Sequence, residues 1–174
     1  MTTGALYFFY KDKEDLFDCV VGPAAESVKA ILLEHTMLEE EAIARDQIMD
    51  ILEDIEVSKA LIHFYYSNKE EAILLLRKSQ GSSYENFVDD LVAIMEESSR
   101  ILFEAIAKTQ GHAMFTECTL HWFAHIQVES FLHVLSHDMP EEETLKQIEI
   151  VTTFLRGGYE KLIDAGKYFT DHLK

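Results

Sequence analysis

The residues that decide the fold stand at the start of the chain, where Thr2–Phe17 reads TTGALYFFYKDKEDLF. One of the two threonines can cap a very short helix over residues 4–9. Asp12, followed three positions later by another acid, predicts the N-cap of a second helix. The four consecutive aromatic residues at 7–10 cannot all face one core from so short a helix, so we expect some of these rings to be exposed and to contact a partner.

Beyond this stretch, apolar residues recur with a helical period almost everywhere, and strand patterns are absent. We expect Pro23 to kink or break the helix after Asp12 near residue 20, with the helix resuming to about residue 35. Gly81, Gly111 and Pro140 punctuate the rest of the chain, with Pro140 in a first helical turn. The sequence therefore predicts an all-α bundle whose further helices span residues 42–66, 69–79, 82–111, 112–137 and 141–165.

The composition limits the function classes. The 174 residues suit one domain, or one domain carrying part of another, and 48% apolar residues suffice for a core. Fifteen basic against 32 acidic residues give a net charge of −17, so bulk electrostatics make this chain a poor nucleic-acid binder. There is no apolar run long enough to span a membrane, and Cys19 and Cys118 lack a metal or redox spacing. We expect a cytoplasmic protein that does not interact with membranes.

The first seventeen residues closely resemble the end of the helix-turn-helix of TetR-family transcriptional regulators. That family pattern is a small polar pair, Gly, a small residue, Leu, Tyr, two aromatic positions, a short linker, Lys, an acid and Leu. Phe8 stands where the family often has a polar residue, and Tyr10 stands where it usually has Phe. The run of long helices also agrees with the family. The matching positions are Thr2, Thr3, Gly4, Ala5, Leu6, Tyr7, Phe9, Tyr10, Lys13, Glu14 and Leu16.

The resemblance implies that residues 4–9 are a recognition helix, with Leu6 and Tyr10 packing inward. It divides the chain into residues 1–22, the C-terminal part of a DNA-binding domain, and residues 23–174, a ligand-binding and dimerisation domain. We expect the DNA-binding head to be truncated, because the family's first two helices precede this point. The residues implied to contact DNA are Thr2, Thr3, Gly4, Tyr7, Phe8, Phe9 and Lys13.

The function implied by the resemblance is that of a dimeric, ligand-responsive transcriptional regulator, normally a repressor, and not an enzyme. A small-molecule effector in the bundle would change the spacing of the two recognition helices, and with it the affinity for duplex operator DNA. The helix faces suggest a cavity for an apolar and cationic compound. We expect its lining to include Phe64, Tyr65, Met95, Phe103, His121, Trp122 and His125.

Two further patterns leave alternatives open. The polar residues Glu117, His121, His125, Glu129 and His133 recur at every fourth position. A His-x-x-x-His pair can bind a divalent metal, but core-type neighbours favour a cavity lining or a dimer seam, so we expect no metal and no cofactor. Residues 34–56 hold nine acids against one Arg. This segment indicates a solvated acidic face or, alternatively, an electrostatic mouth for a cationic ligand.

The last expected helix has apolar residues on two faces, which need two partners. Leu145, Ile148 and Thr152 begin one face, and Ile150 and Phe154 lie toward another. Two adjacent glycines cost this helix about 1 kcal/mol each relative to Ala, a cost that close approach of a second subunit would offset. The alternative is an ordinary core helix with tolerated glycines. We expect a homodimer whose interface includes Phe154, Leu155, Gly157, Gly158, Tyr159 and Leu162.

Common catalytic motifs are missing from the sequence. There is no Glu-x-x-His, as in di-iron bundles, and no His-Glu-x-x-His, Gly-x-Ser-x-Gly, Gly-x-Gly-x-x-Gly or Gly-Lys-Thr. We therefore expect no enzymatic activity. The alternative to a regulator is a helical dimer that binds a small molecule or a metal and has no role at DNA.

Overall fold

The structure is a computed structural model that describes residues 8–45, 51–110 and 115–165. These residues form helices and connecting turns without a strand, which confirms the all-α prediction. No helix in this part of the chain combines the length and apolar character needed to cross a membrane. The helices are α2 (Lys13–Ala44), α3 (Ile51–Ser67), α4 (Lys69–Arg77), α5 (Phe87–Gln110), α6 (Glu117–Leu135) and α7 (Glu141–Asp164).

Helix α2 begins as the sequence predicts but continues further. The Asp12 carboxylate accepts the backbone N–H of Asp15 at 2.9 Å, which caps the first turn. Pro23 lies inside the helix, which continues to Ala44, so the helix does not end near residue 20. The neighbouring Val21 and Ala24 are buried, and their packing holds together the helical turn in which Pro23 has no N–H to donate. The expected domain boundary at residues 22 and 23 therefore lies within one helix.

Three other helix boundaries differ from the sequence prediction. The predicted helix 42–66 is not continuous in the described part, since α2 ends at Ala44 and α3 begins at Ile51. Hydrogen-bonded turns over residues 82–86 precede α5, which begins at Phe87. Helix α6 begins at Glu117 because the Thr116 side chain accepts the Thr119 N–H. Pro140 is the N-cap residue of α7, one position before the first turn in which the sequence pattern places it.

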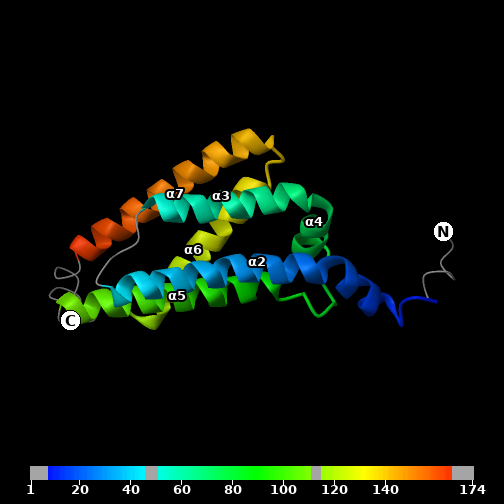
Figure 1. Ribbon diagram of the computed structural model, residues 1–174, viewed down its shortest axis with the longest axis horizontal. Helices are drawn as coiled ribbons and strands as arrows, with labels where there is room; N and C mark the ends of the chain where they lie inside the picture. The colour runs from blue at the N-terminus through cyan, green and yellow to red at the C-terminus, as the bar shows by residue number, and fades with distance from the viewer. Residues whose placement is uncertain (1–7, 46–50, 111–114, 166–174) are drawn as a thin grey trace.

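The helices form a bundle in which α2 lies along α5, and α3 lies along α7 (Figure 1). Helix α6 packs against α5 and α7, and the short α4 lies beside the N-terminal half of α2. One core cluster joins Val21 and Ala25 of α2 to Phe87 and Leu91 of α5. A second surrounds Phe103, and a third joins α3, α6 and α7. This arrangement leaves a space at the centre of the bundle.

Candidate ligand-binding site

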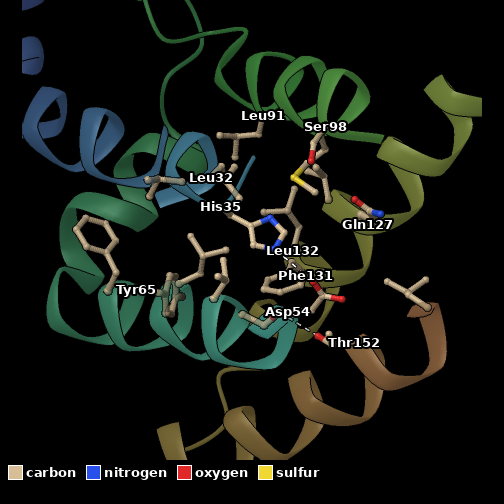
Figure 2. A pocket seen from close by; sticks show the side chains of 18 of the residues that line it. Leu32, His35, Asp54, Tyr65, Leu91, Ser98, Gln127, Phe131, Leu132 and Thr152 are labelled. Carbon is tan, nitrogen blue, oxygen red and sulfur yellow. Dashed lines mark hydrogen bonds and ion pairs between the residues drawn. The ribbon is translucent and has the colours of Figure 1, made fainter. Parts of the chain in front are cut away.

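The central space is a cavity of about 220 Å³ to which all six helices contribute side chains (Figure 2). Its walls are mainly apolar, with Leu32 from α2, Tyr65 from α3, Leu91 from α5 and Phe131 from α6. Small-molecule sites in proteins are typically concave, apolar and provided with a few polar groups. The cavity has this character.

The structure brings together four of the seven residues predicted to line the cavity. Phe64, Tyr65, Met95 and Phe103 lie in its wall. The other three do not line it, because α6 faces the cavity with its second half, from Gln127 onwards. The three residues outside the wall are His121, Trp122 and His125.

These three residues lie on the first half of α6. His121 is exposed, and its Nδ1 lies 2.7 Å from an oxygen of Glu96 on α5. Its ring meets that of His125 edge-on, with the centroids 4.6 Å apart. Trp122 is 60% exposed. The predicted histidine row is therefore a feature of the outer surface of α6 and its seam with α5.

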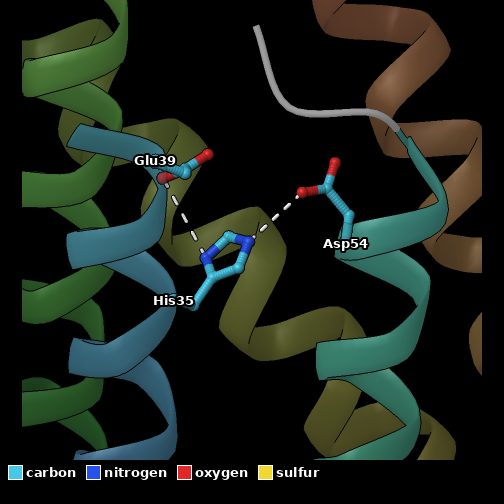
Figure 3. Close-up of side chains that lie close together, drawn as sticks. All are labelled: His35, Glu39 and Asp54. Atoms are coloured by element: carbon cyan, nitrogen blue, oxygen red, sulfur yellow. Dashed lines mark hydrogen bonds and ion pairs between the residues drawn. The ribbon is translucent and has the colours of Figure 1, made fainter. Parts of the chain in front are cut away.

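One end of the cavity is polar, and His35 lies at the centre of this polar end (Figure 3). His35 and Glu39 lie one turn apart on α2, while Asp54 is in the first turn of α3. His35 Nε2 lies 3.2 Å from Asp54 Oδ1, and His35 Nδ1 lies 3.9 Å from Glu39 Oε2. The imidazole thus lies between two carboxylates from different helices.

Groups from two further helices hold these carboxylates. Ser98 of α5 donates its hydroxyl to Glu39 Oε2 at 2.5 Å. Arg156 of α7 donates to Asp54 Oδ2 at 2.9 Å, with both side chains largely buried. Because each carboxylate is anchored through one oxygen, its orientation toward the cavity is restricted. Four helices therefore contribute to the polar end.

Burial and neighbouring charge shift the protonation of this cluster. Burial raises the pKa of Glu39, which the Ser98 hydrogen bond and His35 only partly oppose. Burial alone would lower the pKa of His35, but the hydrogen bond to Asp54 and the two nearby carboxylates outweigh it and raise the pKa. Both shifts favour the protonated form, of Glu39 because it is buried and of His35 because two carboxylates lie beside it.

Gln127 adds an unused hydrogen-bond acceptor to the cavity wall. Its Nε2 donates to the Tyr159 hydroxyl at 3.0 Å. Its buried Oε1 has no hydrogen-bond partner among the residues that the structure describes. Since buried polar atoms are nearly always paired, this oxygen is available to a donor placed in the cavity.

Part of the polar end could be predicted from the sequence. Glu39 and Asp54 belong to the acidic run at residues 34–56, for which an electrostatic mouth was one alternative. His35 was missed, although its spacing of four residues from Glu39 places both side chains on one helix face. Only the packing of α3 against α2 shows that Asp54 joins them.

The residues implied to contact DNA are described only in part. Phe8 and Phe9 are 84% and 69% exposed, and their rings meet edge-on. Lys13 is exposed at the start of α2. Thr2, Thr3, Gly4 and Tyr7 lie outside the described residues.

The structure separates the six residues expected at a dimer interface into two groups on α7. Leu155, Tyr159 and Leu162 point into their own protomer, where Tyr159 and Leu162 pack in the Phe103 cluster and Leu155 lines the cavity. These three are therefore occupied by contacts within the chain. The outward group is Phe154, Gly157 and Gly158, with Phe154 77% exposed.

Comparisons of this chain with models of protein families, with curated proteins and with solved structures found no match.

Proposed function

We propose that this chain is the ligand-binding and dimerisation part of a TetR-like transcriptional regulator, a repressor that responds to a small molecule in the central cavity. The observation that carries the proposal is the position of α2. This helix lines the cavity from Ala24 to Glu39, and it begins directly after the segment that resembles a recognition helix. A displacement of α2 at the cavity would therefore move that segment.

The cavity walls support an effector with an apolar body. Side chains such as Leu32, Leu91 and Leu132 offer no hydrogen bonds. Binding would therefore be driven mainly by the removal of apolar ligand surface from water. Gln127 Oε1 would accept one hydrogen bond from the ligand. The polar end would determine which ligands are accepted, because an uncompensated anion beside Glu39 and Asp54 is disfavoured.

The outer face of α7 supports a homodimer. Ile150 and Phe154 are 61% and 77% exposed on one side of this helix. A Cβ atom added to Gly157 or Gly158 would meet nothing within 4 Å, so packing within the protomer does not require glycine there. A second copy of α7 meeting this face near a two-fold axis would cover the apolar side chains and use the glycines for close approach.

Fluorescence of the apolar dye N-phenyl-1-naphthylamine tests the cavity. We expect saturable binding by wild type, since the dye would be transferred from water to an apolar site. Met95→Trp should weaken binding at least about tenfold by filling the cavity. Met37→Trp is the matched control, because Met37 is 63% exposed on α2. Equal dye binding by all three folded proteins would contradict a ligand site in this cavity.

A helical binding dimer without a role at DNA is the second candidate function. The net charge of −17 favours it, since a chain this acidic repels phosphate. Movement of the start of α2 distinguishes the two candidates, because only the regulator requires this movement when the cavity is filled.

A further inference from the structure

We propose that His35, Glu39 and Asp54 bind one divalent transition-metal ion, such as Zn²⁺ or Mn²⁺, at the polar end of the cavity. This site goes beyond the effector function and does not depend on it. One nitrogen and two carboxylates form a ligand set that such ions accept readily. The ion would add a metal centre to a cavity whose remaining wall is apolar.

The distances suit a single ion. One ligand atom from each of the three side chains can be chosen so that all lie within 4.8 Å of one another. Bonds of roughly 2.1 Å from one ion place neighbouring ligand atoms about 3 to 4 Å apart, so small side-chain rotations would complete the site. Two of the ligands share a helix face and the third faces them from α3 (Figure 3).

The surrounding contacts are those expected around a metal site. Ser98 and Arg156 each bond one carboxylate, and so orient the two acids without occupying every oxygen. Arg156 also contacts Glu160, which draws part of its charge away from the cluster. The positioning therefore comes from helices that do not supply ligands themselves.

Charge and burial also favour an ion. The side chains of His35, Glu39 and Asp54 are 11%, 10% and 15% exposed, so water screens their charges poorly. With His35 neutral, two carboxylates face the single guanidinium of Arg156 and leave an excess of one negative charge. A divalent cation would reverse this excess.

The position of the site at the cavity wall leaves room for further ligands. Three protein ligands leave at least one coordination position open in a four-coordinate ion. Because all three side chains line the cavity, that position would be open to water or to a donor atom of a molecule bound there. The ion would then select effectors that carry a metal-binding group.

Mn²⁺ binding to the purified full chain, followed by electron paramagnetic resonance of the free ion, tests the proposal. We expect one Mn²⁺ per chain, and at least about tenfold weaker binding in Glu39→Gln and in Asp54→Asn. Mn²⁺ favours oxygen ligands, which reduces its binding to the histidine pairs of α6 and the turn after it, 121/125 and 133/137. Double alanine variants of those pairs are the matched controls and should bind Mn²⁺ as wild type does.

Two results would overturn the site. One is a chain with both histidine pairs replaced and the cluster intact that binds no Mn²⁺ or Zn²⁺ in calorimetry. The other is undiminished binding by a folded Glu39→Gln or Asp54→Asn protein. Circular dichroism checks folding, and Glu39→Gln keeps a side-chain oxygen that can accept from Ser98. Because that titration needs no substitution within the cluster, loss of folding in both cluster variants would not protect the proposal.

Discussion

At the scale of single residues, Tyr159 and Gln127 show how neutral polar groups are placed in the apolar cavity wall. Tyr159 packs among the Phe103, Phe115 and Phe123 rings, yet its hydroxyl accepts a hydrogen bond from Gln127. Burial raises the pKa of Tyr159 to about 12, although the Gln127 hydrogen bond opposes the shift. The phenol therefore remains neutral, and a ligand in this cavity would meet a hydroxyl rather than a charge.

This pKa leads to a prediction about alkaline stability. Because the folded pKa of Tyr159 lies above the unfolded value near 10, its contribution is complete below pH 10 and lost as the pH rises toward 12. Tyr159→Phe should therefore remove part of the fall in unfolding free energy over that range. Urea unfolding of wild type and Tyr159→Phe at pH 9 and pH 11 measures this fall in unfolding free energy. An equal fall in both proteins would refute the prediction.

At the scale of helices, α2 connects the beginning of the chain to the cavity. Asp12 caps its first turn, and Lys11 donates its backbone N–H to Asp15 at 2.9 Å, so the helix has a defined start. Further along, its buried face includes Ala25, Leu32 and Glu39. The helix can transmit a displacement from Glu39 to Lys13, because the packing around Val21 holds the one turn whose backbone hydrogen bond is missing at Pro23.

The cap at Asp12 can be tested by substitution. Asp12→Ala should lower the free energy of unfolding by about 1 kcal/mol, because the N–H of Asp15 loses its acceptor. Chemical denaturation measures this change. Asp12→Asn should retain most of the stability, since an amide oxygen also accepts that bond. An alanine variant as stable as wild type would show that the cap contributes nothing.

The two glycines of α7 give opposite predictions for the protomer and the dimer. A Cβ atom at Gly158 meets no neighbour within the protomer, so in Gly158→Leu the gain in helix propensity should raise protomer stability by up to about 1 kcal/mol. The same substitution should weaken the dimer by blocking close approach of a second helix. Sedimentation velocity over a concentration series measures assembly, with Glu40→Leu, at an exposed position of α2, as the control. A wild-type chain that sediments as a 20.0 kDa monomer would exclude the interface.

Helix periodicity predicted most of the elements, but it could not predict how they assemble. The Asp12 cap and the Pro140 start are local signals, and both are present in the structure. Of the two outcomes expected at Pro23, a kink or a break, the break is wrong, because tertiary packing around Val21 holds the helix together. The meeting of His35 with Asp54 depends on the packing of α2 against α3 across nineteen residues of sequence, which no local pattern encodes.

At the scale of the whole molecule, the net charge of −17 governs encounters with other polyanions. We expect the 174-residue chain to bind duplex DNA weakly or not at all near physiological salt, because few cations are available to replace counterions around the phosphates. A gel-shift titration measures this. Sub-micromolar binding would contradict the expectation.

The most direct test of the proposed mechanism is the distance between the starts of the two α2 helices in a dimer. Cys19 and Cys118 are both exposed, so Cys118→Ser leaves Cys19 as a single site for a nitroxide label near the start of α2. Pulsed electron paramagnetic resonance then measures the label-to-label distance with the cavity empty and with it saturated by N-phenyl-1-naphthylamine. We expect a defined distance between subunits that shifts when the dye binds, and a similar shift in Met95→Trp, in which the indole fills the cavity. No measurable distance between subunits, or the same distance distribution in all three samples, would contradict it.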